Sequence, residues 1–104
     1  MNDDRDTAPL PPVACTSMAM LRDQIDRIDR ALLDLLAERA GYIDRAIDLK
    51  RAEGLPARTT DRVAEVLANV GAGEAARGLD THLIEGIWRD LIEWGIAHEA
   101  RELG

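Results

Sequence analysis

The sequence predicts an all-α protein of one domain, built from three helices in the order long, short, long. It has no Phe, and two Trp and one Tyr are its only aromatic residues, whereas Leu, Ile, Ala, Glu and Arg are frequent, as is typical of helices. No segment has the two-residue alternation of a strand. A chain of 104 residues with 46% hydrophobic residues buries only a limited core alone, so we also expect an oligomer.

Residues 1–17 contain three of the four prolines and no periodic apolar pattern, which predicts a disordered or loosely packed leader before a helical domain over residues 18–104. The leader is acidic where a signal peptide is basic, and no apolar run approaches the roughly 18 residues of a membrane span. The single Cys15 has no intramolecular disulfide partner. We therefore expect a soluble, unprocessed protein of the cytoplasm.

The first helix is predicted from Leu21 to about Arg51 or Glu53. Its apolar residues at 21, 25, 28, 32 and 35 are spaced alternately by four and three, the pattern of a helix that packs lengthwise against other helices. Gly54 and Pro56 then supply a stop signal.

The second helix is predicted to start after Thr59 or Thr60. Its apolar face carries Val63, Val66, Leu67 and Val70. Gly71 and Gly73 weaken its second half.

The third helix is predicted to start at Asp80 or Thr81, either of which can cap it. We expect it to bury Ile84, Ile87, Trp88, Leu91 and Ile92.

Two cations share one face of the first helix. The four-three alternation continues from Leu35 to Arg39 and then Tyr42, so Arg39 falls within the apolar seam. Lys50 lies only about 20° further around the helix and roughly 16 Å along it. Burying such cations requires an acidic partner or an anionic ligand. An equally good interpretation is that Arg39 pairs with a core carboxylate while Lys50 extends to water.

Along the helix, Arg22 lies about 25 Å before Arg39 and about 42 Å before Lys50. One small ligand therefore cannot reach both Arg22 and Lys50 of the same chain. It joins the same site only if it comes from a second, antiparallel chain, and the pattern alone favours an exposed pair with Asp26. Arg62 stands in the first turn of the second helix, where a cation opposes the helix dipole. A solvent-exposed arginine is the more frequent explanation.

A carboxylate occupies an apolar line of the third helix, because steps of four, three and four lead from Trp88 through Ile92 and Gly95 to Glu99. Gly95 either leaves space for a ligand or permits close helix packing, and fraying of the helix end is the competing explanation for Glu99. His82 and His98 have no further His or Cys at ligand spacing, so no metal site is predicted. The net charge of -7 argues against nucleic-acid or acidic-membrane partners.

Four segments, "LRDQIDRID", "LLAERAGYIDRAIDLK", "DRVAEVL" and "GLD...LIEGIWRDLIEW", together resemble the all-helical chorismate mutase family, over about residues 20–102 and with no gap between Arg22 and Glu99. The resemblance implies three helices that assemble as an intertwined homodimer. It also implies the Claisen rearrangement of chorismate, a small dicarboxylate, to prephenate in aromatic amino-acid biosynthesis, without cofactor or metal.

The resemblance also implies roles for single residues. Arg22 matches the arginine that reaches a substrate carboxylate from the partner chain, Arg39 the one that binds the other carboxylate region, and Arg62 the second-helix arginine that helps to hold the ligand. Lys50 and Glu99 match the two donors to the ether oxygen. An ionised carboxylate cannot donate a hydrogen bond, so we expect Glu99 to act in its protonated form and activity to favour acidic pH.

Two positions depart from the family pattern. Thr59 and Val63 stand where typical mutases have Asp and Glu, and Val63 cannot make the contact of that Glu with the ring hydroxyl. Arg62 followed by Val63 is similar to isochorismate pyruvate lyases, which form salicylate and pyruvate but keep Gln at the position of Glu99. We favour a mutase, with such a lyase second and a non-catalytic helical interaction module last.

Overall fold

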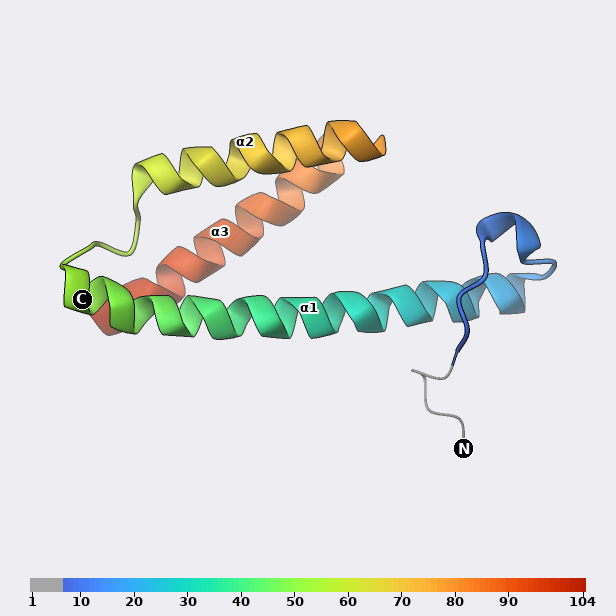
Figure 1. Cartoon of the computed structure of the whole chain (residues 1–104), viewed down its shortest axis with the longest axis horizontal. Coiled ribbons are helices and arrows are strands. Elements are labelled where there is room, and N and C mark those ends of the chain that lie inside the picture. Colours follow the sequence, from blue (N-terminus) through green and yellow to red (C-terminus); the bar gives the residue numbers. More distant parts are fainter. Residues whose placement is uncertain (1–6) are drawn as a thin grey trace. The chain divides into compact units, whose positions relative to one another are not determined.

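The computed structural model describes residues 7–104; the first six residues of the predicted leader lie outside the described part. The element order is a short 3-10 helix η2 (Pro12–Ala14), then α1 (Met18–Glu53), α2 (Thr60–Arg77) and α3 (Thr81–Leu103), with no strand in this part (Figure 1). The predicted all-α class and the long, short, long order are confirmed. Among the same residues, no helix combines the length and the apolar character that a membrane crossing requires.

The chain divides into two compact units, Met1–Arg39 and Ala40–Gly104, with the boundary inside α1. In the first unit the described part of the leader is attached to the start of α1 by polar contacts. Gln24 Nε2 donates to the Ala8 carbonyl at 3.0 Å, and Gln24 Oε1 accepts from the Leu10 amide at 3.2 Å. Most of residues 7–17 are nevertheless exposed.

The predicted seam of α1 is open to solvent along the first unit. Four of its apolar side chains are exposed: Ile25, Ile28, Leu32 and Leu35. Contiguous exposed apolar surface of this kind is unusual for a protein that acts as a monomer. Arg39, which the pattern placed in the core, is accordingly only partly buried in the single chain.

The predicted helix ends are close to those observed. Gly54 takes a φ of 70°, which glycine adopts without strain, and the Leu55 amide donates to the Lys50 carbonyl at 2.9 Å to end α1. Thr59 precedes α2 but its side chain makes no capping hydrogen bond. The α2 helix continues through Gly71 and Gly73 and ends at Gly78, whose φ is 66°.

In the second unit α2 packs against α3, and α3 also lies along the end of α1 (Figure 1). Asp80 caps α3, as predicted, by accepting from the Leu83 amide at 2.8 Å. The Arg51 guanidinium donates to the Glu102 carbonyl at 3.0 Å, which fastens the C-terminal turn of α3 to α1.

The buried residues are few. Among the described residues the buried large apolar side chains are those of Ile47 in α1 and Ile84 in α3, and the buried charged ones are those of Glu74 and Glu99. The prediction that Ile87 is buried is wrong for the single chain, because its side chain is exposed. A core this small leaves much apolar surface to be covered by something else.

Candidate active site

The centre of the candidate site is an ion pair between α1 and α3. Lys50 Nζ lies 3.0 Å from Glu99 Oε1, and the side chains are only 17% and 5% exposed. Desolvating two charges is expensive, and an ion pair so deeply buried is weak support for stability in itself. A charge pair of this cost in a chain with so small a core points to a chemical use.

The two members of this pair differ in their hydrogen bonding. Lys50 Nζ also donates to the Ala57 carbonyl at 2.7 Å, which ties the ammonium to the connection between α1 and α2. Glu99 Oε1 is buried and has no hydrogen bond in the described structure, so its contact with Lys50 is one of charge and not of aligned donation. A buried carboxyl oxygen with unused hydrogen-bonding capacity is available to a ligand.

Gly95 of α3 lies against Ile43 of α1, one turn before Glu99. The residue is buried, and a Cβ there would lie 3.6 Å from Ile43 Cδ1, an ordinary van der Waals distance. Ile43 therefore occupies the space beside Gly95, and a Cβ at residue 95 would fit against it without a clash.

Two of the residues predicted for the second helix lie at its exposed start. Arg62 is exposed and forms an ion pair with Glu65, one turn further along α2. The Thr59 carbonyl accepts from the Val63 amide at 3.0 Å, and Thr59 is partly buried. An exposed arginine in a single i,i+3 pair is easily released to bind an anion, because such pairs are worth little.

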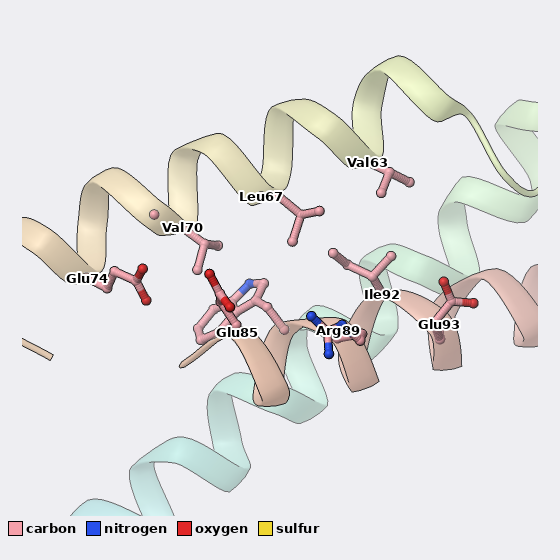
Figure 2. Close-up of a pocket in the computed structure, with 10 residues that line it drawn as sticks. Val63, Leu67, Val70, Glu74, Glu85, Arg89, Ile92 and Glu93 are labelled. Atoms are coloured by element: carbon pink, nitrogen blue, oxygen red, sulfur yellow. The ribbon is translucent and has the colours of Figure 1, made fainter. Parts of the chain in front are cut away.

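Val63 belongs to an apolar groove between α2 and α3 with a volume of about 370 Å³. Figure 2 shows Val63, Leu67, Val70 and Glu74 projecting from α2 toward α3. The α3 side is lined by Trp88 and Ile92 together with three charged residues, Glu85, Arg89 and Glu93. The groove thus has an apolar floor and charged edges.

Glu74 is the unusual residue of this groove. It is 8% exposed, and its Oε2 has no hydrogen-bond partner among the described residues. A buried carboxyl oxygen without a hydrogen bond is costly, so we expect a water molecule, a ligand or a second chain to meet it.

Sequence reasoning missed a second ion pair, between the connection and α3. Arg58 Nη2 donates to both oxygens of Glu93, at 3.0 and 2.7 Å. The hydrogen bond from Arg58 lowers the pKa of Glu93, and the same bond raises the pKa of Arg58. Because the pKa of Glu93 is lowered on folding, the pair stabilises the fold above the ordinary glutamate pKa and is lost as pH falls through the lowered value.

His98 and Trp94, for which the sequence predicts no ligand site, make contacts near the end of α3. His98 Nε2 lies 2.6 Å from Asp44 Oδ1, and the ring of Trp94 stacks on that of His98 with centroids 4.9 Å apart. The His98–Asp44 contact joins α3 to α1, whereas the stacked rings of Trp94 and His98 both belong to α3. No cluster of His, Cys, Asp and Glu that could hold a metal ion occurs in residues 7–104.

The remaining two predicted residues belong to the first unit. Arg22 is exposed near the start of α1, and Arg39 is partly buried at the end of the unit. No ion pair of Arg22 with Asp26, the alternative suggested by the sequence, is found in the described structure.

Curated relatives carry the same kind of domain. The chain is 34% identical over 91 residues to the isochorismate pyruvate lyase of Pseudomonas aeruginosa, covering 86% of this chain and 88% of that protein. It is 40% identical over 75 residues to the T-protein of Enterobacter agglomerans, covering 72% of this chain and 20% of that protein. The bifunctional chorismate mutase/prephenate dehydratase of the same organism is 36% identical over 73 residues, which is 70% of this chain and 19% of that protein.

No solved structure gives a significant match. The model of the family chorismate mutase type II matches residues 21–100, which includes all of the candidate site residues. The first of the relatives is matched over nearly its whole length, and the other two over about a fifth of theirs. The chain therefore belongs to the chorismate mutase type II family.

Proposed function

We propose that this protein converts chorismate to prephenate by a Claisen rearrangement, with Lys50 and Glu99 at the reacting ether oxygen. The observation that supports the proposal is the Lys50–Glu99 pair between α1 and α3, because these are the two residues to which the resemblance assigns the donors to the ether oxygen. The rearrangement breaks a carbon–oxygen bond as a carbon–carbon bond forms within one molecule. It needs no nucleophile, metal or cofactor, so catalysis is electrostatic and conformational.

Negative charge grows on the ether oxygen in the transition state, and donors already in place stabilise it without reorganising. Lys50 Nζ is held at 2.7 Å by the Ala57 carbonyl, so its position is set before substrate arrives. Glu99 supplies the second donor when protonated. Stabilisation that is stronger in the transition state than in the ground state is what accelerates the step.

The substrate is a dianion, and three arginines supply its positive surroundings. Arg39 binds one carboxylate region, Arg62 leaves Glu65 to help hold the ligand, and Arg22 arrives from a partner chain. Thr59 and Val63 lie beside this ligand. The bound enolpyruvyl group is held folded over the ring, so part of the entropic cost of reaching the transition state is met by binding. This lowers the activation free energy of the step.

The protein acts as an intertwined homodimer. The exposed apolar side chains of α1 and the groove between α2 and α3 are complementary in kind, since each offers an unpaired apolar face. The buried Glu74 at the groove wall lacks a partner within the described chain. A second copy of α1 seated on the groove covers both and brings Arg22 to the site.

Replacing Leu32 by Asp is expected to weaken the dimer and lower activity by about tenfold or more at micromolar protein, because a buried charge without a partner costs several kcal/mol. Analytical ultracentrifugation measures the mass and a chorismate assay the activity across a concentration series. Leu83→Asp is the matched control, because Leu83 is equally exposed but lies on α3 outside the groove lining. A Leu32→Asp protein that remains dimeric and fully active contradicts the proposal.

A second candidate function is isochorismate pyruvate lyase, which forms salicylate and pyruvate. Two observations favour it: Val63 replaces the family's usual carboxylate, and the relative matched over 88% of its length carries that name. Against it, Glu99 stands where those lyases have Gln.

Purified protein offered chorismate and isochorismate separately distinguishes the two functions. We expect loss of chorismate with formation of prephenate, and at most slow appearance of salicylate fluorescence. Salicylate as the main product would assign the lyase activity instead. Turnover of neither substrate would favour the interaction module. We place the enzyme in the cytoplasm, where Cys15 remains a thiol.

A further inference from the structure

The position of the Lys50 ammonium depends on a segment outside the helices. Its hydrogen bond of 2.7 Å is to the backbone carbonyl of Ala57, in the connection between α1 and α2. That connection contains Gly54 with a φ of 70° and lacks helical hydrogen bonds of its own beyond the end of α1. The Ala57 carbonyl can orient the Lys50 ammonium only if the irregular segment that carries it is itself held in one position.

Arg58, the residue after Ala57, is what attaches this segment to α3. Its Nη2 reaches both carboxylate oxygens of Glu93, and Glu93 precedes Glu99 by six residues, or about 9 Å of helix. The α3 helix therefore holds Lys50 in two ways. It acts directly through Glu99, and indirectly through Glu93, Arg58 and the Ala57 carbonyl.

We infer that Arg58 and Glu93 are positioning residues for Lys50, which hold the Ala57 carbonyl where it orients the ammonium. Neither residue needs to touch the substrate. The side chains of the pair are 49% and 54% exposed, and exposed ion pairs contribute little to overall stability. Their loss should alter the geometry of the site far more than the folding of the chain. The effect on catalysis rests on the proposed function, whereas the effect on Lys50 itself does not.

Three variants test the inference by kinetics: Arg58→Ala, Glu93→Ala and the double replacement. We expect kcat to fall about tenfold, short of the hundredfold that a full 1 Å misplacement can cost, while KM changes little. The double variant should be no slower than either single one, since each breaks the same contact. Arg45→Ala is the matched control, because the exposed Arg45–Asp48 pair, at 65% and 62% exposure, stays within α1.

Two kinetic results would overturn the inference. One is an unchanged kcat in Arg58→Ala. The other is a rise in KM alone, which would mean that Arg58 binds the anionic substrate directly. A similar loss in Arg45→Ala would indicate a general effect of removing surface charge, and it would equally overturn the inference.

A second measurement does not depend on activity, because Lys50 is the only lysine in the sequence. Lysine enriched with ¹³C at Cε therefore gives one side-chain NMR signal from the whole dimer or chain. We expect this signal to shift in Arg58→Ala and Glu93→Ala and to stay in place in Arg45→Ala. An unmoved signal in the first two variants refutes the positioning role even if the protein proves to be a mutase. A moved signal in a protein that turns over neither substrate supports the positioning role and refutes only the proposed function.

Discussion

Replacing Lys50 by Met is expected to lower kcat for prephenate formation by about 10²–10³-fold, the usual loss when one preorganised donor to a developing oxyanion is removed. Methionine keeps the length of the side chain but cannot donate to the ether oxygen. It also gives up the hydrogen bond to the Ala57 carbonyl. The loss of chorismate absorbance under saturating substrate measures the effect.

A control must separate this loss from unfolding. In Lys50→Met the buried Glu99 loses its charge partner, and breaking a buried pair on one side typically costs about 3–5 kcal/mol. The comparison is therefore repeated in a Glu99→Gln background, where no buried charge is left alone, with thermal unfolding recorded for each protein. A Lys50→Met, Glu99→Gln protein as fast as Glu99→Gln itself would remove Lys50 from the mechanism.

The helices could be predicted because their signals are local. The four-three spacing of α1, the stop at Gly54 and the cap at Asp80 depend on near neighbours in sequence, and the structure has each of them. Lys50 and Glu99 were found by the same reasoning, since a charge inside an apolar line needs an explanation. Their contact at 3.0 Å was not itself predicted, because the spacing within one helix does not show which residue of another helix it meets.

The Arg58–Glu93 contact and the Ala57 carbonyl could not be predicted in this way. Arg58 lies in an irregular segment without periodicity, and Glu93 stands on a polar line of α3 like many surface glutamates. Nothing in the spacing of 35 residues between them signals a contact. Such tertiary contacts depend on how the helices pack, which no local pattern records.

The sequence pattern predicted more buried side chains than the single chain has, for a related reason. The pattern correctly identified one apolar face on α1, but it could not state whether the covering surface belongs to the same chain. In the described structure Leu32 and Leu35 are exposed. A periodic apolar face predicts that something covers it, and the homodimer proposed above supplies the covering surface from a second copy.

Replacing Glu99 by Gln is expected to change the pH dependence of the reaction more than its rate at acidic pH. An ionised carboxylate has no proton to donate, so our proposal that Glu99 donates to the ether oxygen requires its acid form, whereas the 3.0 Å contact with the Lys50 ammonium favours the ionised form. Wild-type activity should then fall toward alkaline pH, where less of the acid form is available to donate. An amide donates at every pH, so the Gln variant should give a nearly flat profile between about pH 5 and 9.

The two profiles should therefore cross, with Glu99→Gln the faster enzyme at alkaline pH. Calorimetry in buffers of different ionisation enthalpy provides an independent measurement, because wild type should take up a proton on binding a dianionic inhibitor and the Gln variant should not. Glu74→Gln is the matched control, since Glu74 is the other buried glutamate but lies on α2, on the groove wall away from Lys50. Parallel profiles for wild type and Glu99→Gln, with no difference in proton uptake, would mean that Glu99 does not donate to the ether oxygen, and Lys50 would then be the sole donor to that atom.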